Sequence, residues 1–226
     1  MQIILNHSFS SLGLSQLSSY GDIINVETND IVYKAISNHP DIFFCPLGDK
    51  IIIAPNLPQK LKNILIEKGV NFKEGSKPLN YKYPETAYYN AVVTDGFIIG
   101  NTKVMDQSTM GFSNDRKYIH VNQAYTRCNL LPLPNNRFIT SDMGIFNQLK
   151  KENIDVLFVN PNGIKLEGFA NGFFGGCCGV LENKVFIMGS LSHFPQGNLV
   201  REYLSDMEII ELYDGPLLDV GSILFI

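Results

Sequence analysis

The chain has 226 residues, of which 45% are hydrophobic and 18% charged, a balance typical of a soluble globular protein with one large domain or two small ones. Its net charge is −4 with scattered lysines and arginines, which argues against a nucleic-acid partner, and no apolar run approaches the roughly 18–20 residues that span a membrane. The first residues, MQIILNHSFS, lack the basic region and apolar core of a secretory signal, so we expect a cytoplasmic location and reduced cysteines.

One unit recurs along the chain: an apolar strand, a tight turn, a second strand rich in Ile and Phe, and a small or polar residue. Its four full copies begin with residues 44–56, 90–102, 130–142 and 178–190. The turns carry Gly, Asn or Asp, which tolerate the positive φ that tight hairpins require. Each copy is therefore predicted to open with a β-hairpin.

A helix and a returning strand are predicted after the hairpins. Apolar residues at helical spacing and polar residues in capping positions support this pattern. We expect helices over 57–69, 144–153 and 197–206, and strands over 117–122, 154–160 and 207–213. In the second copy, residues 105–116 show no clear helix and are predicted to be irregular. The unit is therefore β-β-α-β.

The two ends of the chain together supply a fifth unit. Residues 219–226 are predicted to pair with the returning strand 2–6, which is followed by a helix over 11–21 and a strand over 22–27. Five units of roughly 45 residues account for the whole chain. We predict one α/β (α+β) domain over 1–226, a five-fold pseudo-symmetric ring closed by the termini. An ordinary α/β or α+β domain with chance similarity among its hairpins is the alternative.

A ring of five ββαβ units resembles the pentein fold of the guanidine-modifying enzymes. These include arginine deiminases, agmatine deiminases, dimethylarginine hydrolases and amidinotransferases, and translation initiation factor six has the fold without catalysis. The stretches HPDIFFCPLG (39–48), GFFGGCCG (172–179) and DGPLLDVGSILFI (214–226) also resemble an uncharacterised clostridial family of that superfamily.

The resemblance implies a Cys nucleophile in the first strand of the last unit and a Gly-His-x-Asp motif that opens the preceding unit. This chain departs from both, with Leu224 or a neighbour at the Cys position, Gly172 at the His position and Phe174 at the Asp position. A similar motif, Asn38-His39-Pro40-Asp41, opens the first unit instead and could face the same axial pocket. The alternative is that it forms a turn with His39 at the surface.

The first strands of the units, which line the axis in a pentein, are predicted to hold all four cysteines: Cys45, Cys128, Cys177 and Cys178. Adjacent strand residues point to opposite faces, so only one of the pair Cys177 and Cys178 is expected to face the pocket. The cysteines are interpreted as buried, inert thiols, or the pair supplies a nucleophile whose thiolate His39 or Arg127 stabilises. A third alternative is a zinc site from Cys45, Cys128 and one of the pair, although the strict spacing of a zinc motif is absent. No metal and no cofactor are predicted.

Further polar residues fall in the same predicted strands: Asp41, Asn90, Arg127, Asn129, Asp219 and Ser222. Polar groups in apolar strands often line a pocket, although these residues could instead pair with each other at the rim. Asp41 and Asp219 suit a cationic head group, and Arg127 suits a carboxylate. The expected ligand is a small guanidino or amino-acid-like molecule.

Three functions remain open on the sequence. The first is a divergent guanidine- or amidine-modifying hydrolase or amidinotransferase that uses Cys177 or Cys178, with His39 as proton partner. The second is a non-catalytic pentein that binds a small molecule, and the third is a protein-interaction ring. The sequence leaves open whether the protein is an enzyme and in which oligomeric state it occurs.

Overall fold

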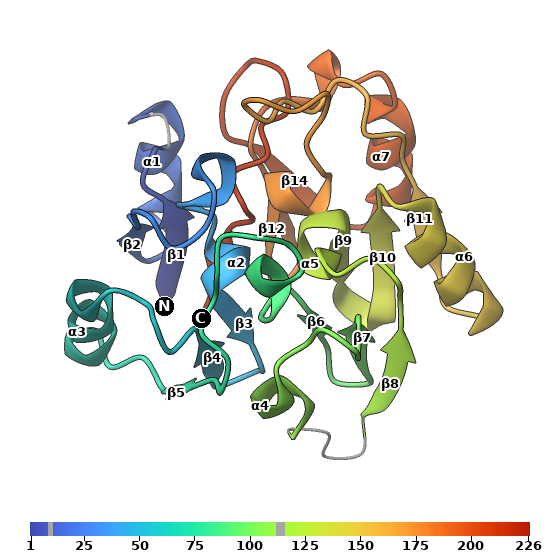
Figure 1. Ribbon diagram of the computed structural model, residues 1–226. Coiled ribbons are helices and arrows are strands. Elements are labelled where there is room, and N and C mark those ends of the chain that lie inside the picture. Colours follow the sequence, from blue (N-terminus) through green and yellow to red (C-terminus); the bar gives the residue numbers. More distant parts are fainter. Residues whose placement is uncertain (9–10, 112–115) are drawn as a thin grey trace.

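Figure 1 shows the computed structural model, which describes residues 1–8, 11–111 and 116–226. In this part of the chain the strands form five separate three-stranded sheets. Each sheet consists of an antiparallel hairpin and a third strand that runs parallel to one of its two strands. The predicted α/β fold class, with five repeats of one unit, is confirmed.

Four units follow the order of the chain. Unit 1 contains β3 (Phe44–Pro46), β4 (Ile51–Ile53) and β5 (Phe72–Glu74), and unit 2 contains β6 (Val92–Val93), β7 (Phe97–Gly100) and β8 (Lys117–His120). Unit 3 contains β9 (Leu130–Leu133), β10 (Arg137–Thr140) and β11 (Val156–Phe158), and unit 4 contains β12 (Cys178–Leu181), β13 (Lys184–Ile187) and β14 (Glu208–Glu211). All four predicted hairpins are present.

Unit 5 joins the two ends of the chain. Its central strand β1 (Gln2–Asn6) pairs antiparallel with β15 (Leu224–Phe225) and parallel with β2 (Asp22–Val26). Ile3 lies opposite Phe225 and Ile4 opposite Leu224. The predicted pairing of the two termini is confirmed, and Figure 1 shows the N- and C-terminal ends close together.

In every unit a helix joins the central strand to the third strand and lies at the outside of the molecule (Figure 1). These helices are α1 (Ser11–Leu17), α3 (Gln59–Glu67), α4 (Gln107–Met110), α6 (Met143–Lys151) and α7 (Gly197–Tyr203). The prediction of an irregular segment over 105–116 is corrected in part. Asp106 caps a single helical turn there by accepting a hydrogen bond from the Ser108 backbone N–H at 2.8 Å, and residues 112–115 lie outside the described part.

Hydrogen bonds near the axis connect each unit to the next. They join Asp41 N to Gly221 O, Asn90 Nδ2 to Asp41 O, Thr126 N to Asn90 O, Arg127 Nη1 to Gly175 O, and Ser222 N to Gly176 O. These bonds run from unit 5 through units 1, 2, 3 and 4 and back to unit 5. The ring is therefore closed by contacts between the segments that begin the units, while each sheet stays separate.

Several residues predicted in first strands lie instead in short helical turns that precede the strands, which corrects that expectation. The turns are α2 (Pro40–Phe43), which contains Asp41, α5 (Thr126–Asn129), which contains Arg127, Cys128 and Asn129, and η4 (Gly175–Cys177). Asn90, Asp219 and Ser222 lie in the loops that lead into β6 and β15. A turn of three or four residues is too short for a helical period to show in the sequence, so strand and turn could not be distinguished there.

The central strand of each sheet is largely buried. In β4, for example, the three isoleucines are at most 2% exposed. Apolar residues on both faces of the small sheets form the core, with the outer helices covering one side. No described helix is long and apolar enough to cross a membrane.

Candidate functional site

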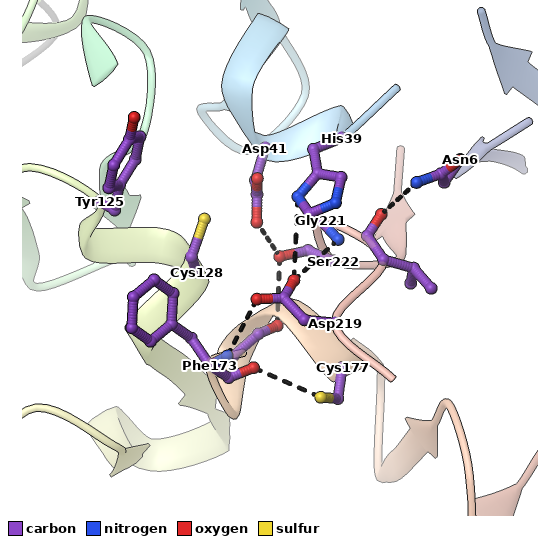
Figure 2. Close-up of polar contacts among 12 residues, drawn as sticks. Asn6, His39, Asp41, Tyr125, Cys128, Phe173, Cys177, Asp219, Gly221 and Ser222 are labelled. Atoms are coloured by element: carbon purple, nitrogen blue, oxygen red, sulfur yellow. Dashed lines mark hydrogen bonds and ion pairs between the residues drawn. The ribbon is translucent and has the colours of Figure 1, made fainter. Parts of the chain in front are cut away.

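His39 and Asp219 meet at the axis from neighbouring units (Figure 2). His39 directly precedes α2, and Asp219 lies in the loop before β15. The His39 Nδ1 and Asp219 Oδ1 atoms are 3.8 Å apart, too far for a hydrogen bond, and the two side chains are 4% and 1% exposed. The alternative that His39 sits at the surface of a turn is therefore wrong.

Backbone groups and one hydroxyl hold the two carboxylates in place. Asp219 accepts hydrogen bonds from the Phe173 N–H at 2.9 Å and the Gly221 N–H at 3.1 Å. Asp41 Oδ2 accepts from the Ser222 hydroxyl at 2.5 Å. Asp41 Oδ1 and His39 Nδ1 are buried and have no hydrogen-bond partner among the described residues. Because buried polar atoms are rarely left unpaired, the nitrogen of His39, a residue that lines the two cavities described below, is a candidate contact for a bound molecule.

Two glycines leave the space that this arrangement needs. A Cβ at Gly176 would lie 2.0 Å from Asp219 Oδ1, and a Cβ at Gly221 would lie 2.2 Å from the Cβ of His39. Gly221 also has φ +75°, a conformation that side chains disfavour. The glycines around the axis therefore permit close approach of chain segments.

The Asp219 carboxyl is unusual because burial raises its pKa to about 6. The charge of Asp41 adds to this shift, while His39 and the hydrogen bonds from Phe173 and Gly221 oppose it. A buried carboxylate is costly to ionise without a cation beside it. A positively charged group bound next to Asp219 would therefore be stabilised.

Two cavities open on this site. An inner cavity of about 90 Å³ lies at the axis and an outer one of about 610 Å³ leads to the surface. Both have His39, Leu166, Phe169 and Asp219 in their walls, so the two cavities adjoin each other at these residues.

Aromatic side chains cover much of the wall of the inner cavity, namely Tyr33, Tyr125, Phe169 and Phe173. The Tyr33 and Tyr125 hydroxyls lie 3.2 Å apart, and the Tyr33 ring packs against that of Phe169 with centroids 6.1 Å apart. Aromatic faces attract cations, and planar cations stack on them. The inner cavity thus combines one buried carboxylate with aromatic walls.

Among the four cysteines, Cys128 is the one that lines the inner cavity (Figure 2). Asn90 Nδ2 donates a hydrogen bond to its sulfur at 3.1 Å, and Asn90 Oδ1 accepts from the Cys128 N–H at 3.2 Å. Burial, reinforced by the charges of Asp41 and Asp219, raises the pKa of the Cys128 thiol well above its usual value. This thiol is oriented by Asn90, and its raised pKa favours the protonated form.

The paired cysteines lie elsewhere. Cys177 and Cys178 are both fully buried and neither lines the inner or the outer cavity, although one of them was expected to face the pocket. The Cys177 S–H donates to the Phe173 carbonyl at 3.3 Å. Burial raises the pKa of the Cys177 thiol well above its usual value and that of Cys178 to about 12, with Arg127 opposing the shift at Cys178. A catalytic role for either one stays a prediction.

The other residues predicted to bind substrate make contacts within the protein. Arg127 Nη1 and Nη2 donate to the carbonyls of Gly175 and Cys178 at 2.9 and 3.2 Å, and Arg127 lines a separate cavity of about 130 Å³. Asn129 Nδ2 donates to the Tyr125 carbonyl at 2.9 Å. Asn90 orients Cys128, as described above. The structure therefore brings His39, Asp41 and Asp219 together, while Arg127 and Asn129 connect elements of the ring.

No group of three or more His, Cys, Asp or Glu side chains in the described residues is placed to hold a metal ion. The zinc alternative from Cys45, Cys128 and one of the paired cysteines is therefore not assembled. Cys45 instead points its thiol towards the Ala91 carbonyl, with 3.9 Å between the sulfur and the oxygen.

Sequence reasoning missed the aromatic walls and the placement of Cys128. Tyr33 and Phe169 come from loops without a repeated pattern, and Phe173 was noted only within the stretch GFFGGCCG that carries a family resemblance. Figure 2 shows Tyr125 and Cys128 facing the same space as Asp219. The one available signal was that Tyr125 directly precedes α5 in unit 3, as His39 directly precedes α2 in unit 1.

Three solved structures with a similar fold share low sequence identity with the chain. An amidinotransferase from Microseira wollei in the saxitoxin biosynthetic pathway aligns with a TM-score of 0.56 and 13% identity, over 92% of this chain and 77% of that one. A dimethylarginine dimethylaminohydrolase from Pseudomonas aeruginosa aligns with 0.54 and 11%, over 93% and 91%. An agmatine deiminase from C. jejuni aligns with 0.52 and 10%, over 93% and 87%. These likenesses show the pentein fold.

A sequence family described as a family of unknown function (DUF6873) matches residues 4–224. No curated protein shows a significant match to the chain.

Proposed function

The chain belongs to the family of unknown function (DUF6873), and we propose that its axial pocket binds a small molecule with a planar cationic group, a guanidinium or an amidinium. The observation that supports this most is the buried carboxylate of Asp219 in an aromatic cavity, with no ion pair other than its 3.8 Å contact with His39 Nδ1 among the described residues. A guanidinium supplies a positive charge, donates hydrogen bonds to carboxylate oxygens and stacks on aromatic rings.

The dimensions of the space support the same proposal. The inner cavity of about 90 Å³ suits a head group, and the outer cavity of about 610 Å³ falls in the usual range for ligand pockets. The charge of the buried Asp41 carboxylate, which acts on Asp219, adds to the attraction for a cation at this place. The enzymes of similar fold are named for reactions of guanidino compounds, which supports the proposal by analogy of fold.

Isothermal titration calorimetry and thermal unfolding with butylguanidine, butylurea and butylamine test this proposal. Butylurea has nearly the same shape as butylguanidine without the charge, and butylamine has the charge without the planar group. We expect butylguanidine to bind most tightly and to raise the melting temperature. Asp219→Asn should abolish this binding, whereas Asp214→Asn, at a carboxylate with a 91% exposed side chain, should leave it unchanged. Equal binding of butylguanidine and butylurea would contradict the proposal.

A second candidate function, hydrolysis or group transfer through a thiol, is favoured by the position of Cys128 in the wall of the inner cavity. A cation bound beside the sulfur would lower the raised pKa of Cys128, because opposite charge stabilises a thiolate. The thiolate would attack the guanidinium carbon, and one nitrogen would leave as ammonia or an amine after taking a proton, for which His39 is the candidate donor. Water would then release the product from the sulfur.

Release of ammonia or amine from guanidino compounds measures this activity. We expect Cys128→Ser to abolish any turnover while butylguanidine still binds. Cys177→Ser and Cys178→Ser are the matched controls, because neither thiol lines the cavity. Loss of turnover in Cys177→Ser or Cys178→Ser alone would instead support the catalytic role that the sequence predicted for the pair. If the unaltered protein binds butylguanidine but turns over no guanidino compound, the catalytic candidate is wrong and the proposed binding function stands.

A further inference from the structure

The outer cavity has a charge character opposite to that of the inner one. Its inner end has the Asp219 carboxylate, whereas its rim has Lys34 and Lys165 with a single acidic residue, Glu167. The whole chain has a net charge of −4, so an excess of positive charge at this mouth is a local feature. Charged groups around an opening select which ligands enter it.

Lys165 is held in a fixed relation to the carboxylate site. It forms a parallel bridge with Leu218, its backbone N–H donates to the Leu217 carbonyl at 2.8 Å, and its carbonyl accepts from the Asp219 N–H at 2.9 Å. Lys165 and Asp219 therefore lie on two paired segments of the backbone. One segment carries a positive side chain and the other a negative one.

Both ammonium groups are accessible to a ligand. The Lys34 and Glu167 side chains are 91% and 88% exposed and their charged atoms are 3.9 Å apart, a weak pair that a ligand anion can displace. No ion pair among the described residues involves Lys165. The mouth of the cavity therefore offers two cations.

We propose that the ligand of the axial pocket is a guanidino or amidino acid, whose cationic head lies beside Asp219 and whose carboxylate lies between Lys34 and Lys165 at the rim of the outer cavity. This inference rests on the proposed function and extends it from the head group to the whole ligand. A ligand with a second positive charge would be repelled at the rim, so the two lysines discriminate against guanidino amines. A ligand with a trailing carboxylate satisfies both ends of the cavity.

Three ligands that share a head group and differ in the tail test the inference: 4-guanidinobutyrate, butylguanidine and 4-aminobutylguanidine. Calorimetric titration at low and at physiological salt should give affinities that fall in that order, with a difference of about fivefold or more between neighbours at low salt. The difference should shrink as salt increases, because exposed charges are screened. Guanidino acids with two to five methylene groups would locate the best chain length.

Charge reversal at the rim provides the matched comparison. In Lys34→Glu and Lys165→Glu the preference should shift from the acid towards the amine, while the affinity for butylguanidine stays within about twofold. Lys50→Glu, in the exposed β3–β4 turn and outside both cavities, should not change the order.

The outcomes separate the two proposals. If butylguanidine binds but all three ligands bind alike, the inference about the carboxylate is wrong and the proposed function stands. If none of the three binds, the proposed function is wrong and the inference fails with it. An unchanged order of affinities in both rim variants would also overturn the inference.

Discussion

Two buried charges stand near the same axis, and their surroundings differ. The Arg127 guanidinium donates to two backbone carbonyls, of Gly175 and Cys178, and so connects unit 3 to unit 4. The Asp219 carboxylate accepts from two backbone N–H groups, but a buried nitrogen of His39 close by has no partner in the described chain. A buried charge with protein partners supports the fold, whereas unpaired buried atoms beside a charge indicate a binding site.

Asp219 and Arg127 also differ in the cavities that they line. Asp219 and His39 line both the inner and the outer cavity, which together reach the surface. Arg127 lines only a small cavity with Pro46, Pro132 and the residues around β15. The four experiments below test whether Arg127 serves the fold and Asp219 the site.

The largest effect is expected from Arg127→Met. The substitution removes both hydrogen bonds to the carbonyls and leaves the buried Asp41 carboxylate without the nearby positive charge that attracts it. We expect a loss of about 3–5 kcal/mol in the free energy of unfolding, measured by urea denaturation. Arg201→Met is the control, because Arg201 is 40% exposed and should cost about 1 kcal/mol or less. Similar costs for the two variants would refute a special role for Arg127.

A change of pH should affect stability through Asp219. Its pKa rises from the ordinary 3.8 to about 6 on folding, mainly through burial, so the folded chain binds this proton more tightly than the unfolded chain. The contribution of Asp219 to stability therefore falls as the pH rises from about 4 to about 6, by about 3 kcal/mol in total, and is constant above that range.

Urea denaturation between pH 4 and pH 7 measures this dependence. In Asp219→Asn the group no longer titrates, so the fall in stability over this range should be smaller by about that amount. His39 and Asp41 face Asp219, so the same series in His39→Gln separates the contribution of the imidazole. If the free energy of unfolding depends on pH identically in the unaltered protein and in Asp219→Asn, the raised pKa of Asp219 is contradicted.

A smaller effect is expected from Gly176→Ala, which adds one methyl group beside the site. The new Cβ would lie 2.0 Å from Asp219 Oδ1, so the carboxylate has to move. We expect a cost of about 1–3 kcal/mol and weaker binding of butylguanidine. Gly111→Ala is the control, since its Cβ would lie at ordinary contact distances of 3.5 Å from the Gln107 carbonyl and 3.9 Å from the Ser108 carbonyl, and it should change stability by about 0.5 kcal/mol or less. Undisturbed binding in Gly176→Ala would show that the position of Asp219 is unimportant.

The smallest effect is expected from Cys177→Ala, at about 1 kcal/mol, because the residue is buried away from both cavities and serves packing. Cys177→Leu should cost more, because the site has no space for a larger side chain. Thiol reagents should label Cys177 and Cys178 slowly in the folded protein and quickly after unfolding, since burial keeps both thiols protonated. Mass spectrometry after a short exposure identifies the labelled residue. Rapid modification of Cys177 or Cys178 in the folded protein would contradict a packing role and indicate a reactive thiol.

The candidate site was predictable in part. His39, Asp41 and Asp219 were predicted from one short motif and one polar residue in an apolar segment, and the structure brings all three together. Arg127 was predicted to hold a ligand carboxylate but donates to the backbone, because the sequence does not show which carbonyls lie opposite a side chain. The conspicuous pair Cys177 and Cys178 drew attention away from Cys128, whose place in the cavity wall depends on residues of other units.

The sequence by itself determined the repeat, the hairpins and the pairing of the two ends, because turn residues and apolar alternation are local properties that each strand records. Only the tertiary structure decided which polar residues face a cavity. The five segments that begin the units meet at the axis although they are far apart in the sequence, and the direction of several side chains there depends on turns of three or four residues. Such turns are too short to show a period in the sequence, and the contacts that orient them come from other units.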